Sequence, residues 1–199
     1  GTSPPMLRAY GENGTVRWAI EGPSTTQPDM AELLLVPAGQ APCGAWPEHL
    51  IIAWSSGLLE ARTPDEGVPL WQANTPVQGW GITASPVATD DGLLVTTRTG
   101  VELRCFADGT VQHAADTGLG WRNPATLVNG TVHVGDESGQ LWSWVPGEAP
   151  TSIDLGGAIR HAPVLLNDGL LVHVQTQATS RVEWLPLGEN GLPQPASAA

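Results

Sequence analysis

The chain has 199 residues, of which 41% are hydrophobic and 14% are charged, a composition typical of a globular protein and unlike that of a disordered one. Its formal net charge of −12 repels phosphate backbones and anionic lipids, which argues against binding to nucleic acid or to a membrane surface. No apolar run approaches the roughly 18 residues that a membrane-spanning helix needs, so we expect no membrane span.

The N-terminal segment predicts two short β-strands. Residues 6–20 read MLRAYGENGTVRWAI, two strand-like runs separated by a turn rich in Gly and Asn. The chain opens GTSPP, without a methionine, which indicates a processed or trimmed start.

Residues 24–76 predict four strands, AELLLV, HLIIAW, LLEART and PLWQA. The first connection in this unit, from Pro37 to His49, is several residues longer than its counterparts in the later units. Long loops on a rigid scaffold often carry recognition, and Trp46 is a rigid aromatic of the kind that anchors interfaces. We therefore take this loop, with Cys43 and Trp46, as a candidate interaction surface; the alternative is that Trp46 folds back over the domain.

Three further units follow, at residues 78–116, 118–154 and 156–185. The clearest reads SPVAT, GLLVTT, VELRCF and TVQHA, with the turns DDG, RTG and ADG between its strands. Gly after Asp or another small residue is the turn chemistry of tight hairpins. The last unit ends in a Pro-rich tail, residues 186–199, which is a poor strand.

The units repeat with a period of about 39 residues, the kind of period that indicates an array or a propeller. Pro86, Pro124 and Pro163 lie 38 and 39 residues apart, and the turn glycines Gly92, Gly130 and Gly169 keep the same spacings. A four-stranded sheet of this size cannot bury both faces alone, whereas sheets stacked around an axis cover one another.

We therefore expect an all-β protein with a single domain over residues 1–185, a β-propeller of four-stranded antiparallel blades. Four blades fit the length, with the N-terminal strand of residues 15–20 completing the last blade and closing the ring. Five blades or an incomplete ring are the alternatives.

The junction of the third and fourth strands carries a family resemblance. Gly67 precedes Trp71 by four residues, and Gly14 precedes Trp18 by the same spacing. This resembles the tryptophan-docking repeat of the PQQ-like propellers, Ala-x-Asp-x-x-Thr-Gly-x-x-x-Trp. The resemblance implies that these tryptophans and glycines are structural, each tryptophan packing over the neighbouring blade.

The repeat is degenerate in this chain. Thr63 replaces the motif's Asp, Ala9 lies one residue too close to Gly14, and His113 replaces the tryptophan of the next unit. Quinone-dependent members of the family have eight blades and often a pair of adjacent cysteines. At about 39 residues a blade this chain holds at most five blades, and it has no Cys-Cys pair.

We expect no enzyme, no cofactor and no bound metal. Propeller glycosidases need carboxylates aimed at the axis from the first strand of each blade, and the first strands here (LLLV, SPVA, NPAT and APVL) contain no Asp or Glu. The acidic turns fit ordinary hairpin chemistry. His133 and His173 are too few for a zinc site, so satisfied sheet histidines are the better interpretation.

The two cysteines predict no disulfide. Cys105 takes a small, buried place in its repeat, and Cys43 lies in the long loop. A disulfide needs Cα atoms within about 7 Å, which the repeat alignment does not suggest. We therefore expect a reduced core Cys105.

These observations favour a non-catalytic scaffold that presents loops to another protein. Trp80 and Trp121, which flank first strands near one end of the central channel, are further interaction candidates; they could equally plug the channel. The chain resembles the eight-bladed envelope propeller lipoproteins of outer-membrane barrel assembly, which implies an envelope complex as partner, an extracytoplasmic location (periplasm or cell surface) and a lipid anchor upstream. A ligand-sensing domain of a larger receptor or kinase is the alternative, a propeller enzyme comes third, and a homodimer would join two chains into one ring.

Overall fold

The computed structural model describes residues 4–23, 32–75, 82, 84–117 and 123–194, and these residues form β-strands joined by turns, with no helix among them. Accordingly, none of these ranges supplies a helix long and apolar enough to cross a bilayer.

Three antiparallel sheets have four strands each, consecutive in sequence apart from one insertion. The first blade contains β3 (Leu34–Val36), β6 (His49–Ala53), β7 (Leu58–Arg62) and β8 (Pro69–Asn74). The second blade contains β9 (Val87–Ala88), β10 (Leu93–Thr96), β11 (Gly100–Arg104) and β12 (Val111–Asp116). The third blade contains β13 (Thr126–Val128), β14 (Thr131–Gly135), β15 (Gln140–Trp144) and β16 (Thr151–Asp154). The expected all-β architecture of four-stranded antiparallel sheets is confirmed.

Three smaller elements complete the structure. The N-terminal hairpin pairs β1 (Met6–Tyr10) with β2 (Val16–Glu21). The inserted hairpin pairs β4 (Gly39–Ala41) with β5 (Gly44–Trp46) and lies in the chain between β3 and β6. The C-terminal sheet has the order β17 (Val164–Leu166), β18 (Gly169–Gln175) and β19 (Ser180–Pro186).

The turns follow from the residues at their tips. Between β13 and β14, Asn129 and Gly130 both have positive φ, 49° and 80°. Two consecutive residues with positive φ make the tight hairpin turn whose twist suits antiparallel strands, and Asn-Gly is its preferred pair. The sequence therefore sets this hairpin, and with it the register Val128↔Thr131.

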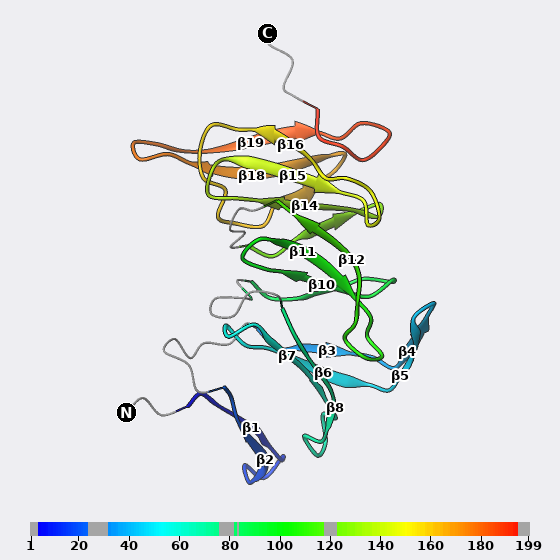
Figure 1. The fold of residues 1–199 in the computed structure, drawn as a ribbon. Helices are drawn as coiled ribbons and strands as arrows, with labels where there is room; N and C mark the ends of the chain where they lie inside the picture. The colour runs from blue at the N-terminus through cyan, green and yellow to red at the C-terminus, as the bar shows by residue number, and fades with distance from the viewer. Residues whose placement is uncertain (1–3, 24–31, 76–81, 83, 118–122, 195–199) are drawn as a thin grey trace.

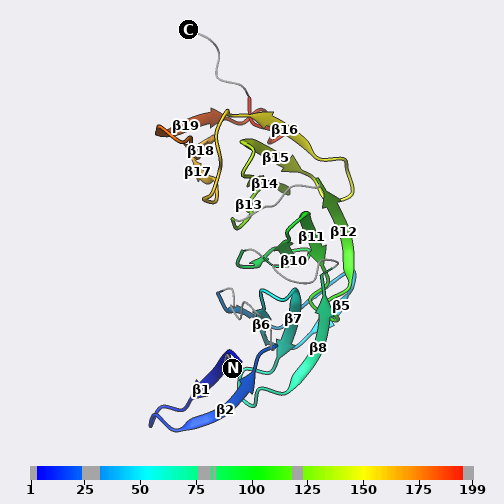
Figure 2. The ribbon, with the colours of Figure 1, turned by 60° about the vertical axis from the view of Figure 1, so that its left-hand side comes forward.

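The hydrophobic core lies between successive sheets, because each sheet buries both faces only by packing on its neighbours. Three clusters fill the three junctions that join the blades and the C-terminal sheet. The first joins Ile51 and Leu59 to Leu93 and Val95, and the third joins Leu141 to Val172. Figures 1 and 2 show the sheets following one another along an arc.

The expected closure of the ring is wrong. β2 pairs with β1 and not with the C-terminal sheet, and the N-terminal hairpin and β19 lie at opposite ends of the arc in both ribbon views (Figures 1 and 2). The physical reason is that β1 already satisfies one edge of β2, while Trp18 packs on Gly67 of the first blade. The described part of the chain is an open arc, which was the incomplete-ring alternative.

Candidate interaction surface

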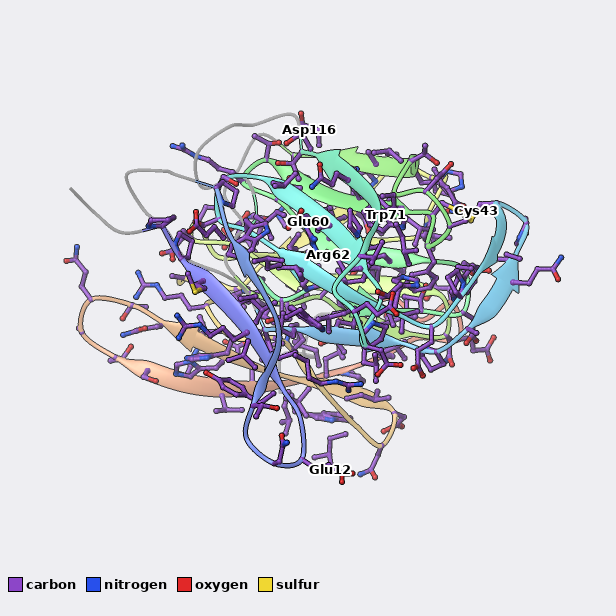
Figure 3. All side chains as sticks on the ribbon, turned by 90° about the horizontal axis from the view of Figure 1, so that it is seen from below. Glu12, Cys43, Glu60, Arg62, Trp71 and Asp116 are labelled. Carbon is purple, nitrogen blue, oxygen red and sulfur yellow. A yellow bond between two sulfur atoms is a disulfide. The ribbon has the colours of Figure 1, made fainter. Side chains whose placement is uncertain are left out.

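The segment from Pro37 to His49 contains a regular hairpin. Its register pairs Gly39 with Trp46, Gln40 with Ala45 and Ala41 with Gly44. The hairpin projects from the stack of sheets, to the right in Figures 1 and 3. Sequence reasoning expected an irregular loop here, because Gly, Pro and Ala dominate the segment and leave no alternation of apolar and polar residues.

A disulfide ties this hairpin to the next blade. Cys43, at the tip of the inserted hairpin, is bonded to Cys105, which directly follows β11, and their Cα atoms are 5.9 Å apart. The expectation of a reduced Cys105 is therefore wrong. The repeat alignment could not show the bond, because no other unit contains the hairpin that carries Cys43 across to its neighbour.

Trp46 fastens the base of the hairpin. Its ring centroid lies 4.9 Å from that of Phe106, and its Nε1 donates a hydrogen bond of 2.9 Å to the carbonyl oxygen of Pro37. A Cβ on the paired Gly39 would lie 2.8 Å from the Trp46 ring, so only glycine allows this approach. The half-buried Trp46 thus folds back on the first two blades and belongs to the support of the surface.

The side chains of residues 37–49 that are exposed, and so free to contact a partner, are small or uncharged except for one carboxylate. The exposed residues of the segment are Pro37, Ala38, Gln40, Pro42, Ala45, Pro47 and Glu48. The disulfide and Trp46 hold them in one arrangement, and a surface fixed before binding loses less conformational entropy when a partner docks. Trp80 and Trp121, the other interaction candidates, lie outside the described residues.

The docking tryptophans contact glycines of the following blade. A Cβ on Gly67 would lie 2.7 Å from the Trp18 ring, and one on Gly109 would lie 2.6 Å from the Trp71 ring. Trp18 Nε1 donates to the carbonyl oxygen of Pro64 at 2.9 Å, and Trp71 Nε1 to that of Phe106 at 2.8 Å. Each tryptophan therefore joins two successive sheets, and Gly67 receives Trp18 from the preceding hairpin.

Two ion pairs, one half-buried at its arginine and one buried, recur on the third strands. Glu60 pairs with Arg62 at 2.8 Å in the first blade, and Glu102 pairs with Arg104 at 2.6 Å in the second. In both blades the arginine Nη1 also donates, at 2.8 Å, to the carbonyl oxygen of a turn glycine, Gly67 or Gly109. Sequence reasoning missed these pairs, although Glu-x-Arg at the same place in two units was the available signal.

The electrostatics of Glu60 suit a structural role. Burial raises its pKa, but hydrogen bonds from Arg62, Trp54 and Gln72 outweigh burial, so the pKa lies below its usual value. The carboxylate therefore stays ionised; Figure 3 labels Glu60 and its partner Arg62.

The two sheet histidines have separate partners. His133 is fully buried, its Nδ1 lies 2.9 Å from Ser143 Oγ, and burial lowers its pKa to about 4. His173 Nε2 lies 2.5 Å from Ser180 Oγ, and its ring centroid is 5.1 Å from that of His161. Over the residues that the structure covers, no three His, Cys, Asp or Glu side chains gather closely enough to hold a metal ion.

Solved structures decide the fold class. BamB from Moraxella catarrhalis is similar, with a TM-score of 0.58 and 17% identity over 93% of this chain and 57% of that one. The fold is that of a β-propeller. The computationally designed Ika8 protein is also similar (TM-score 0.56, 12% identity, 86% of this chain and 62% of that one). So is the Pan2 WD40 domain of Neurospora crassa (TM-score 0.54, 9% identity, 74% of this chain and 45% of that one).

The propeller spans just over half the length of BamB, 57%. No protein-family model matches the chain, and no curated protein sequence does.

Proposed function

We propose that this protein is a non-catalytic propeller scaffold that binds another protein through the inserted hairpin and acts outside the cytoplasm. The observation that carries the proposal is a protruding hairpin of small, exposed side chains, fixed to the next blade by the Cys43–Cys105 disulfide. Loops held on a rigid sheet scaffold are where recognition is concentrated.

The location rests on the disulfide and on the likeness to BamB. Disulfides persist in oxidising compartments such as the periplasm and the cell surface, and are rare in the cytosol. An envelope complex is accordingly the partner class that we propose. The packing of Trp18 and Trp71 on glycines of the next sheet supports our assignment of the repeat to the PQQ-like type.

The absence of catalysis is proposed from the positions of the carboxylates. The first strands β3, β9, β13 and β17 read LLV, VA, TLV and VLL, without Asp or Glu. Glu60 and Glu102, both buried, are each neutralised by an arginine on the same strand, so neither is held as an acid or base for a substrate.

The proposal is tested in two steps. A partner is captured from envelope extract and identified by mass spectrometry, and its direct binding to the purified chain is then measured. Ala45→Arg places a large charge on the exposed face of β5 without touching the disulfide. We expect it to weaken binding at least about tenfold, the cost of burying one unpaired charge in an interface.

Ser152→Arg is the matched control, because Ser152 is exposed on β16 of the third blade, whereas the inserted hairpin is held to the first and second blades. It should leave binding within about twofold, the effect usual for a surface change outside an interface. Equal binding by the Ala45→Arg and Ser152→Arg variants, or no protein retained by the unaltered chain, would overturn the proposal.

A further inference from the structure

The C-terminal end of the arc presents an apolar sheet face. Val164, Leu166, Val182 and Trp184 are 58%, 46%, 63% and 46% exposed. The register pairs Val164 with Leu171 and Leu171 with Trp184, so these side chains share one face of the C-terminal sheet. The opposite face, with Leu170, Val172 and Val174, is buried against the third blade.

The N-terminal end of the arc presents an unfilled docking place. Gly14 has positive φ, like Gly67 and Gly109, but a Cβ built on it would meet no atom of the described residues within 4 Å. A shallow cavity of about 430 Å³ lies at the same turn, lined by Gly11, Glu12, Asn13 and Arg17. Beside it, Met6, Tyr10 and Val16 are exposed on the face of the N-terminal hairpin that points away from the first blade.

The junctions between successive sheets inside the arc show which side chain packs on a turn glycine of this kind. Trp18 packs on Gly67 and Trp71 packs on Gly109. His113 takes the equivalent position, since a Cβ built on Gly147 would lie 3.5 Å from its ring. In every case an aromatic side chain of one sheet meets the turn glycine of the sheet that follows it. By this rule, the Gly14 turn is a place where an aromatic side chain of another sheet can pack.

Trp184 is a large aromatic exposed on the C-terminal sheet: its ring lies over Gly169 of the same sheet, where a Cβ would come within 2.5 Å of it, and the residue is 46% exposed. A small residue pairs with each docking tryptophan on the neighbouring strand. Ala9 of β1 pairs with Trp18 of β2, and Ala61 of β7 pairs with Trp71 of β8. Ala61 and Trp184 occupy equivalent places, because each pairs with the third residue of its second strand, Ile51 or Leu171. In the C-terminal sheet the large aromatic ring, that of Trp184, therefore lies on the third strand, β19, where the first blade has a small residue.

We propose that two copies of this chain join head to tail, the C-terminal sheet of each packing on the N-terminal hairpin of the other, with Trp184 directed at the Gly14 turn. One chain carries two complementary surfaces, an apolar sheet face with a large ring and a glycine turn without a ring over it, so two copies can serve each other as partners. Head-to-tail contacts close into a ring when the rotation between copies fits, and this arc matches 57% of BamB, so two arcs have about the extent of one propeller.

Charge does not oppose this contact. The outward face of the C-terminal sheet carries His173, Gln175 and Ser180 beside its apolar residues, and none of its side chains is a carboxylate, a lysine or an arginine. The outward face of the N-terminal hairpin carries one arginine and one glutamate, Arg8 and Glu21. The net charge of −12 per chain is therefore carried outside the two joining faces.

The molar mass in solution tests the proposal. Light scattering after size exclusion should give twice the 20.8 kDa of one chain. Val182→Glu and Tyr10→Glu, one at each end of the arc, should raise the dissociation constant at least about tenfold, because a dimer would bury either charge unpaired. Val111→Glu, an exposed apolar position on β12, should leave the mass unchanged.

Mixing the variants separates a head-to-tail contact from a symmetric one. The Val182→Glu chain keeps an intact N-terminal hairpin, and the Tyr10→Glu chain keeps an intact C-terminal sheet, so together they can form one native junction. We expect the mixture to recover a dimer that neither variant forms alone. A wild-type monomer, an open series of larger oligomers, or a mixture that stays monomeric would overturn the proposal; circular dichroism confirms that each variant is folded.

Discussion

At the scale of single residues, the docking tryptophans decide how firmly neighbouring sheets hold together. Trp71 lies over Gly109 and donates its Nε1 hydrogen bond to Phe106, so it acts on the second blade from the first. We expect Trp71→Ala to lower the free energy of unfolding by about 3 kcal/mol, the cost usual for removing a packed aromatic ring. Trp71→Phe keeps a ring and loses the hydrogen bond, so it should cost about 1 kcal/mol.

Urea unfolding of the two variants measures both numbers, with Leu70→Ala as the control. Leu70 is the neighbouring residue on β8 and is 41% exposed, so its loss should cost little. If Trp71→Ala were no more destabilising than Leu70→Ala, the ring would not be joining the blades.

His133 makes the stability of the fold depend on pH. In the folded protein burial holds its pKa near 4, whereas the unfolded side chain has the ordinary value of 6.5. Between pH 6.5 and 4 the unfolded state therefore binds more protons, so stability is lost as the pH falls through that range, by up to about 3 kcal/mol. Burial also lowers the pKa of His49, which acts in the same direction.

His133→Asn removes the titrating group and should flatten this pH dependence. Urea unfolding at pH 7 and at pH 4.5 measures it, with the exposed His161→Asn as the control that should keep the wild-type slope. An unchanged slope in the His133→Asn protein would show that His133 is not the group responsible.

At the scale of elements, the Cys43–Cys105 bond joins an insertion in the first blade to the second. It closes a loop with a sequence separation of 62 residues. Confining a loop of that length in the unfolded chain stabilises the fold by about 4 kcal/mol in the chain-entropy description. Reduction with dithiothreitol should therefore lower the thermal midpoint of the wild type and leave a Cys43→Ser, Cys105→Ser variant unaffected.

The outcome that contradicts this view is an equal response of the two proteins to reductant. Because Trp46 also holds the inserted hairpin, through Phe106 and Pro37, we expect the reduced protein to remain folded at room temperature. A near-ultraviolet circular dichroism spectrum retained after reduction would show this.

Strands with a clear pattern were predictable from sequence, whereas their long-range partners were not. GLLVTT and VELRCF correspond to β10 and β11, because apolar runs flanked by Asp-Gly and Thr-Gly turns set local hairpins. The strand of residues 15–20 was also predicted, but the sheet that it was predicted to join was wrong. A strand's sequence specifies which side chains it buries and not which sheet edge it joins, so only the structure showed that β1 takes that edge.

For the candidate surface, too, local features were predictable from the sequence and the long-range contact was not. The resemblance to the tryptophan-docking repeat marked Trp18, Trp71 and Gly67 as docking residues, through the local spacing of four residues between glycine and tryptophan. The Cys43–Cys105 bond depends on how far the inserted hairpin reaches, and a single copy of an insertion offers no repeat from which to infer that reach.

At the scale of the whole molecule, an open arc of stacked sheets has unequal stability along its length. The second and third blades are covered on both faces, whereas the N-terminal hairpin and the C-terminal sheet are each covered on one. In such stacks stability is close to a sum of terms between neighbours, so the end units open most readily. We expect amide hydrogens of β10, β11 and β14 to exchange slowest and those of β1 and β17 fastest.

Hydrogen exchange followed by mass spectrometry at two protein concentrations tests both this gradient and its link to assembly. If the ends of two arcs cover one another, β1, β2 and β17–β19 gain protection as the concentration rises, while the second blade does not change. Uniform exchange along the chain would instead mean that the arc unfolds as one cooperative unit. The disulfide adds to the gradient, because it couples the first blade to the second and holds neither the N-terminal hairpin nor the C-terminal sheet.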